Sequence, residues 1–283
     1  MKVNYEHCAA LVRELDRDRF LATLFAPAEH RDALFSLYAF NVEIARVREL
    51  ARQSLPGEIR LQWWREMLCG ERDGEAAAHP VAAALGKTLS QYGFVVAPLL
   101  ELIDEHLFDL YDEPMATVGA LELYAIRTQS PIFAIAAGIL GAGTKSAELF
   151  TLDASVAYTI AAILRSFSLH AVRRQLYVPL DVLDRYGVKP EEIFAAQVSD
   201  PLLAALAEMR ALAHQHLAAA QAKLQTASPE ILPAFLPVAL VGPQLGRMER
   251  ADYQPFAPQQ IAPWRRQWQL WRAARDPSRI FRS

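Results

Sequence analysis

The stretch "IAAILRSFSLHAVRRQLYVPLD", residues 160–181, decides how the chain is interpreted. Its apolar residues recur with the spacing of a buried helix, at Ile160, Ile163, Leu164 and Phe167. Ser166 and His170 lie four residues apart, so we expect their side chains to leave the same face of that helix. The helical pattern ends at Tyr177-Val178-Pro179, because proline cannot continue a helix.

On either side of this stretch the chain has the composition of helices. Ala, Leu, Glu, Gln and Arg dominate, and no segment alternates with the period of a β-strand. The predicted helices span residues 4–24, 29–53, 57–69, 79–91, 95–111, 117–142, 147–175, 200–225 and 229–248, and a Trp/Arg-rich helix follows at about 257–275. No linker, repeat or charge block divides the chain, so we expect one all-α domain over residues 1–283.

Composition limits the function classes. The 283 residues carry a net charge of -3 and no nucleic-acid motif, which argues against a nucleic-acid partner. Cys8 and Cys69 show no metal or disulfide spacing and suit a reducing compartment. The charged N-terminus lacks the apolar core of a signal peptide, and the apolar run near residues 130–143 is too short for a membrane span. We expect a soluble, cytoplasmic protein.

The predicted helices 117–142 and 147–175 are almost free of charge over long stretches. Helices of this kind are buried on most of their surface, so we expect these two to form the centre of the fold. A central apolar cavity and a filled core remain alternatives, since both give the same sequence pattern.

Four segments, in this order, resemble the squalene/phytoene synthase family, whose all-α members condense two prenyl diphosphates head to head. They are "RFLATLFAPAEHRDALFSLYAFN" (19–41), "LLELIDEHLFDLYDEP" (99–114), "LELYAIRTQSPIF" (121–133) and "ILRSFSLHAVRRQLYVPLDVLDRYGV" (163–188). The resemblance covers roughly residues 5–245. It implies the isoprenoid synthase fold, with Tyr38 before the first aspartate motif, Tyr124 as the central tyrosine and Tyr177 in the Tyr-x-Pro exit.

The family's activity needs paired aspartates on two helices, which bind Mg²⁺ and the substrate diphosphates. The resemblance places Ala45, Glu49, Ser166 and His170 at these four positions. Ala162 and Gln175 stand where the family has an asparagine and an arginine. Only Glu49 is a hard anionic ligand, and a hydroxyl or an imidazole does not hold a Mg²⁺ cluster. We therefore predict no metal, unless the chain is an active prenyltransferase with atypical ligands.

The phrase Glu58-Ile59-Arg60-Leu61-Gln62-Trp63-Trp64-Arg65 resembles one branch of the family most closely. This non-carotenoid branch includes the mitochondrial complex I assembly factor and its bacterial relatives, and it is understood to lack synthase activity. The resemblance thus implies a pseudoenzyme with a protein client in a respiratory complex.

Several arginines form a candidate anion site at the former diphosphate entrance: Arg46, Arg48, Arg165, Arg173 and Arg174. Arginine forks bind phosphate well, but pairing with nearby carboxylates on helix surfaces is the alternative. The acidic stretch that includes Asp104, Glu105 and Asp109 is expected to be a solvated or capping face rather than a metal site. His214 and His216 are expected at the surface.

Three tryptophans share one face of the last predicted helix, at Trp264, Trp268 and Trp271. Six arginines accompany them, namely Arg265, Arg266, Arg272, Arg275, Arg279 and Arg282. An aromatic and basic helix suits an anionic membrane surface, whereas tryptophans packed into the protein would exclude lipid contact. The sequence leaves both alternatives open.

Three functions compete on these residues. The first is a non-catalytic assembly or scaffold factor that binds an isoprenoid or lipid and sits peripherally at the inner membrane. The second is an active prenyltransferase, and the third is a lipid or isoprenoid carrier. An enzyme needs the metal ligands, a carrier needs an apolar cavity, and an assembly factor needs a surface that faces a protein.

Overall fold

Every regular element in the described part of the chain is helical. The computed structural model describes residues 2–51, 53–141, 144–224, 228–259 and 261–281, and over residues 144–150 it describes the backbone alone. No strand occurs within these ranges. The predicted all-α fold is confirmed.

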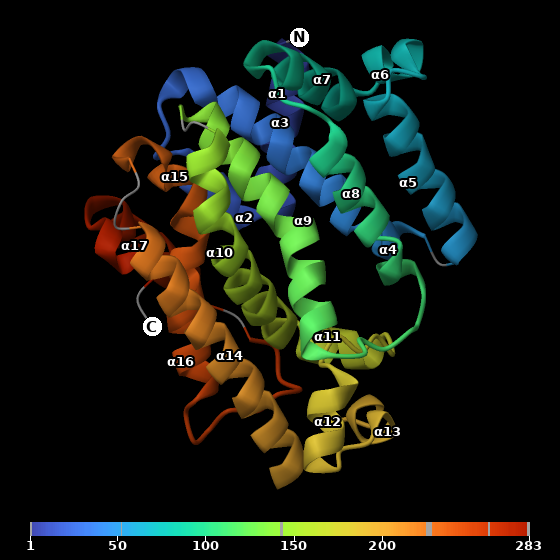
Figure 1. Ribbon diagram of the computed structural model, residues 1–283, viewed down its shortest axis with the longest axis vertical. Helices are drawn as coiled ribbons and strands as arrows, with labels where there is room; N and C mark the ends of the chain where they lie inside the picture. Colours follow the sequence, from blue (N-terminus) through green and yellow to red (C-terminus); the bar gives the residue numbers. More distant parts are fainter. Residues whose placement is uncertain (1, 52, 142–143, 225–227, 260, 282–283) are drawn as a thin grey trace. The chain divides into compact units, whose positions relative to one another are not determined.

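The helices cluster into two compact units. The first comprises Met1–Tyr111, Arg127–Leu149 and Ala227–Pro237. Its helices are α1 (Lys2–Leu15), α2 (Arg17–Thr23), α3 (Ala28–Ala45), α4 (Val47–Leu50), α5 (Ser54–Leu68), α6 (Asp73–Ala78), α7 (Pro80–Tyr92), α8 (Ala97–Glu105), η1 (Phe108–Leu110), η2 (Pro229–Ile231) and α15 (Leu232–Phe235). Helices α1, α3 and α7 pack against one another, and α5 packs against α8 (Figure 1).

The second unit comprises Asp112–Ile126, Phe150–Thr226 and Val238–Ser283. Its helices are α11 (Phe167–Val172), α12 (Leu180–Tyr186), α13 (Pro190–Phe194), α14 (Asp200–Leu224), α16 (Val241–Met248), α17 (Pro263–Arg275) and η4 (Pro277–Arg279). Helix α14 packs on α12 and α16. Helices α9 (Val118–Ile139), α10 (Thr144–Arg165) and η3 (Leu236–Leu240) contribute residues to both units. The single domain expected over the whole chain stays a prediction.

Two predicted helices are interrupted at single residues. Helix α3 gives way to α4 at Arg46 (φ -99°, ψ 5°), and α10 gives way to α11 at Ser166 (φ -96°, ψ 10°). At both residues the backbone N–H still donates to the carbonyl four residues earlier, on Val42 and Ala162. Each interruption is therefore a bend within a helical path, and the uninterrupted helices predicted at 29–53 and 147–175 are wrong there.

Local helix-start signals explain two further differences from the predicted helices. Asp16 divides the helix predicted at 4–24, because its side chain accepts a hydrogen bond from the Arg19 backbone N–H at 3.1 Å and so begins α2. Short helices α6, α12 and α13 lie in segments where no helix was predicted. Helix α13 begins at Pro190, since proline fits the first helical turn as well as it ends a helix.

The two long apolar helices are buried as expected. Leu121, Phe133 and Ile160 are at most 1% exposed. Within the described residues, Pro229–Met248 is the one segment with the length and composition of a membrane span, and 72% of its most apolar window is buried inside the structure. A segment in the core of a protein shows this degree of burial, so packing inside the protein accounts for the apolar composition of Pro229–Met248.

Candidate functional site

The first two positions that the resemblance aligns with the family's aspartates, Ala45 and Glu49, lie where α3 bends into α4. Ala45 is exposed and presents only a methyl group. The Glu49 carboxylate binds the Arg46 guanidinium, with Nε donating to Oε2 at 2.8 Å. Glu49 therefore supplies at most one of the several oxygen ligands that a bound divalent cation needs. Arg48 donates to the Leu110 carbonyl at 3.1 Å and so ties α4 to η1.

The other two aligned positions, Ser166 and His170, lie where α10 bends into α11. Ser166 and His170 are both half-buried, and the His170 backbone N–H donates to the Ser166 carbonyl at 2.9 Å. The His170 ring packs on Tyr177 with centroids 4.7 Å apart, and Tyr177 packs on Tyr124 at 6.0 Å. The structure therefore brings three predicted site residues together, His170, Tyr177 and Tyr124, in an aromatic cluster within the second unit.

Tyr38 belongs to a different environment, in the first unit. It is buried, and the Arg19 guanidinium lies over its ring at 5.4 Å. Arg19 is itself only 3% exposed and binds the Asp16 carboxylate at 2.9 Å and the Gln129 amide oxygen at 2.7 Å. Sequence analysis missed Arg19, because nothing in the pattern "DRDRF" separates a buried arginine from its exposed neighbour Arg17.

The candidate anion-binding arginines have partners inside the protein. Arg46 binds Glu49, as described above. Arg174 adopts a left-handed backbone (φ 56°), and its guanidinium lies 4.6 Å over the Phe194 ring. Arg173 is exposed and Arg165 half-buried. Arg46 lies in one unit and Arg173 and Arg174 in the other, and an anion site built from them stays a prediction.

The residues present do not fit a Mg²⁺ cluster. Magnesium in proteins is held by carboxylate and other hard oxygen ligands, and the four motif positions supply one carboxylate, already paired with an arginine. Across the part of the chain that the structure describes, no three His, Cys, Asp or Glu side chains gather as metal ligands could.

The acidic stretch makes ion pairs. Asp104 is exposed and binds Arg65, whereas Glu105 binds Arg127 at 3.2 Å. Asp109 is 8% exposed, and one carboxylate oxygen lies 2.6 Å from His106 Nδ1. The expected solvated face is therefore wrong for Asp109, because η1 turns its side chain inward toward His106.

His216 is also less exposed than expected. Its ring lies between two carboxylates, with Nδ1 2.8 Å from Asp153 and Nε2 3.2 Å from Glu122, and Lys223 binds the same Asp153. Burial alone would raise the pKa of Asp153, but hydrogen bonds from Lys223 and His216 outweigh it and lower that pKa. The cluster spans α9, α10 and α14, which a single sequence does not bring together. His214, which is half-buried, pairs with Glu249.

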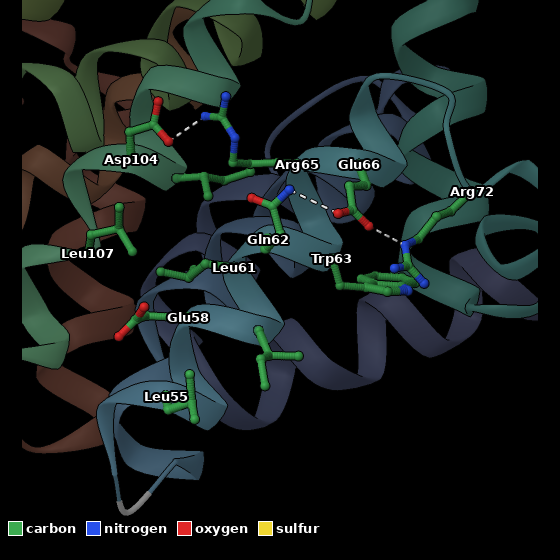
Figure 2. Close-up of a pocket in the computed structure, with 12 residues that line it drawn as sticks. Leu55, Glu58, Leu61, Gln62, Trp63, Arg65, Glu66, Arg72, Asp104 and Leu107 are labelled. Atoms are coloured by element: carbon green, nitrogen blue, oxygen red, sulfur yellow. Dashed lines mark hydrogen bonds and ion pairs between the residues drawn. The ribbon is translucent and has the colours of Figure 1, made fainter.

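A groove of about 490 Å³ runs between α5 and α8 in the first unit (Figure 2). We call it the α5–α8 groove. Its lining residues are Leu55, Glu58, Ile59, Leu61, Gln62, Trp63, Arg65, Glu66, Arg72, Ile103, Asp104 and Leu107. Most residues of the segment 58–65, which resembles the non-carotenoid branch of the family, thus line the groove. Leu55 and Ile59 are 64% and 63% exposed, which is unusual for aliphatic side chains one turn apart on a helix.

Four charged side chains of the α5–α8 groove form ion pairs within the protein, and the fifth, Glu58, accepts a hydrogen bond from the Tyr111 hydroxyl. Figure 2 shows Arg65 reaching Asp104 across the groove, and Glu66 held between Gln62 and Arg72. Hydrogen bonds from Gln62 and Arg72 lower the pKa of Glu66. Trp63 donates its indole N–H to Glu75 at 2.9 Å. The groove therefore offers aliphatic surface bordered by compensated charge.

The tryptophans of α17 face away from the protein. Trp264, Trp268 and Trp271 are 64%, 51% and 37% exposed, whereas Leu270 and Ala273 are buried on the opposite side. The alternative in which these indoles pack into the core is therefore wrong. Arg265 is exposed beside them and Arg266 is half-buried, while Arg282 lies outside the described residues. Lipid contact stays a prediction.

Comparisons with known proteins identify the family of this chain. The family model for squalene/phytoene synthase matches residues 12–272. The human protein "NADH dehydrogenase (ubiquinone) complex I, assembly factor 6" is 28% identical over 252 residues, which cover 89% of this chain and 76% of that protein.

Two solved structures share the fold. A dehydrosqualene synthase crystallised with a ligand has a TM-score of 0.86 at 15% identity, covering 98% of this chain and 96% of that one. The squalene synthase HpnC from Alicyclobacillus acidocaldarius has a TM-score of 0.77 at 21% identity, covering 90% and 95%. The predicted isoprenoid synthase fold is confirmed.

Proposed function

The chain belongs to the squalene/phytoene synthase family, and from that premise we propose that it is a non-catalytic member that assists the assembly of a respiratory complex. One observation carries the proposal. At the positions that the resemblance assigns to the family's metal-binding aspartates, this chain has Ala45, Ser166, His170 and a Glu49 that is paired with Arg46. The human relative is named as a complex I assembly factor, and this name supports an assembly role for a member that does not catalyse the family's reaction.

The alternative is an active prenyltransferase, favoured by the likeness in fold to dehydrosqualene synthase. It would require ligands other than the carboxylates that Mg²⁺ prefers. The half-buried His170 stacks on Tyr177, and a ring that packs there serves the local structure without any metal. A carrier of an isoprenoid or lipid would need an apolar cavity within the fold. The α5–α8 groove, which is open and bordered by charges, does not resemble one.

An assembly factor needs a surface for its client, and we place this surface at the α5–α8 groove. Leu55 and Ile59 project their aliphatic side chains into solvent, and covering each would contribute about 1–2 kcal/mol to binding. Four of the five charged residues of the groove form ion pairs, which an incoming charged face would have to disrupt, and Glu58 already accepts a hydrogen bond from Tyr111. The occupant that fits is a helix of the client protein with a neutral, apolar face.

Complementation tests the proposed function. A host strain that lacks this chain should contain less assembled respiratory NADH dehydrogenase, and the wild-type chain should restore it. Ile59→Asp should fail to restore it, because a carboxylate would be buried against the client's apolar helix. Val3→Asp is the matched control, since Val3 is 73% exposed on another helix. A normal amount of the complex in the deletion strain would refute the assembly role, and full rescue by Ile59→Asp would refute the groove.

A further inference from the structure

Helix α17 exposes a surface that the proposed assembly role does not use. Six side chains form it, and we call it the Trp/Arg patch: Trp264, Arg265, Trp268, Trp271, Arg272 and Arg275. All six are exposed, at positions that repeat along one side of the helix. Leu270 and Ala273 hold the other side of α17 against the second unit. The aromatic face of this helix is therefore its outer face.

Arginine and tryptophan are interleaved within the patch. Trp268 and Trp271 stack with ring centroids 5.0 Å apart. The guanidinium of Arg275 lies 4.1 Å over Trp271, that of Arg265 lies 5.1 Å over Trp264, and that of Arg272 lies 6.0 Å over Trp268. Cation–π contacts of this kind hold the positive charges close to the indole rings, so that charge and apolar surface are presented to one partner together.

The charge of the patch contrasts with that of the chain. The whole chain has a net charge of -3, yet the described residues of α17 include four arginines and no acidic residue. Exposed indoles are costly in water and suit the boundary between headgroups and acyl chains, where one edge is apolar and the other is wet. Guanidinium groups bind phosphate bidentately. Positive charge and interfacial aromatic surface are both complementary to an anionic bilayer.

We propose that the Trp/Arg patch is a peripheral docking site for an anionic lipid bilayer. The arginines contact lipid phosphates, and the indoles enter the headgroup region, while Leu270 and Ala273 keep the helix attached to the protein. This inference is independent of the proposed function, because it requires no client protein and would hold equally for an active enzyme.

Sedimentation of the full chain with vesicles tests the proposal. The chain should bind vesicles of equal parts phosphatidylcholine and phosphatidylglycerol, bind phosphatidylcholine alone weakly, and lose affinity as salt is raised. R265Q/R272Q/R275Q should lower the affinity on the order of 100-fold, at roughly five-fold for each charge near the surface. R13Q/R17Q/R250Q, three exposed arginines elsewhere, is the charge-matched control and should bind like wild type.

A second variant separates the aromatic contribution. W264A/W268A should remove the binding that persists at high salt and leave the far-ultraviolet circular dichroism unchanged, because both side chains project into solvent. Equal losses in the patch variant and in the control would overturn the proposal, since net charge would then explain the binding. Absence of binding to anionic vesicles would also overturn it and would instead favour an acidic protein as the partner of the patch.

Discussion

Arg19 shows how a single residue organises the first unit. The start of α2 places its guanidinium where it binds Asp16, reaches Gln129 on α9, and lies over the rings of Tyr38 and Phe133. A buried guanidinium is stable only when its donors have partners and its charge is compensated. Arg19 therefore joins three helices through one side chain.

We predict that Arg19→Met lowers the free energy of unfolding by about 3–5 kcal/mol, because it leaves the charge of the Asp16 carboxylate uncompensated and the Gln129 amide oxygen without its donor, while the backbone N–H of residue 19 still caps Asp16. Arg17→Met, two residues away on an exposed side chain, should change it by less than about 0.5 kcal/mol. Chemical denaturation of both variants measures this. Similar midpoints for the two would mean that Arg19 adds no more than a surface residue.

Gly138 is required by the close approach of an aromatic ring. A Cβ atom at this position of α9 would lie 2.7 Å from the Phe94 ring. We predict that Gly138→Ala destabilises the chain by about 1–3 kcal/mol through overpacking, and that adding Phe94→Leu restores part of the loss. Gly86→Ala, where nothing lies within 4 Å, should instead stabilise helix α7 by about 0.5–1 kcal/mol. Thermal melting distinguishes the opposite signs.

Asp153 makes the stability depend on pH in a predictable direction. Its folded-state pKa lies below the usual 3.8, so its ionised form stabilises the fold above that pH, and the contribution disappears as pH falls through the lower folded value. Asp153→Asn should therefore reduce the free energy of unfolding at neutral pH and cost progressively less at acidic pH, as the pH falls below 3.8. A cost that is equal at both pH values would show that the contacts to His216 and Lys223 do not need the charge.

At the scale of elements, helix positions were predictable and helix bends were not. Apolar residues repeat with the helical period across most of the chain, and this pattern located α3, α9, α10 and α14. The bends at Arg46 and Ser166 contain no Pro or Gly, so no local signal marks them. Short helices such as α12 depend on packing against α14, which lies outside any sequence window.

The candidate sites divide in the same way. The sequence predicted correctly that Trp264, Trp268 and Trp271 share an exposed face, whereas the positions at which the family's aspartates are replaced stay a prediction. It did not predict the α5–α8 groove, because its two walls are separated by the whole of α6 and α7. The contact between His170 and Tyr177 depends on the turn that follows α11, which periodicity does not describe.

Helix α17 itself allows a prediction about which face holds it. Leu270 is fully buried, so Leu270→Ala should cost about 2–5 kcal/mol through lost burial and the cavity that it leaves. Trp268→Ala, on the exposed face, should cost less than about 1.5 kcal/mol, mainly the lost stacking on Trp271, although it removes a larger side chain. Urea denaturation compares the two. A larger loss for Trp268→Ala would place the aromatic face in the core.

At the scale of the whole molecule, the residues that maintain the fold differ from those that the family uses for catalysis. The likeness to dehydrosqualene synthase, with a TM-score of 0.86 at 15% identity, shows that the isoprenoid synthase fold persists through extensive sequence change. What maintains a fold is the apolar pattern of its helices, and that pattern does not depend on a few metal-binding carboxylates. We therefore expect the fold to tolerate the exchange of carboxylates that the resemblance implies at Ala45, Ser166 and His170.

The central claim is that this chain keeps the family's fold without its metal-dependent chemistry. Release of pyrophosphate from farnesyl or geranylgeranyl diphosphate by the purified chain, with Mg²⁺ present, tests the claim most directly. We predict no release above a control without protein, and no effect of chelator or of Glu49→Gln, because the motif positions supply one carboxylate and it is bound to Arg46. Mg²⁺-dependent release that chelator abolishes and Glu49→Gln reduces would contradict the account.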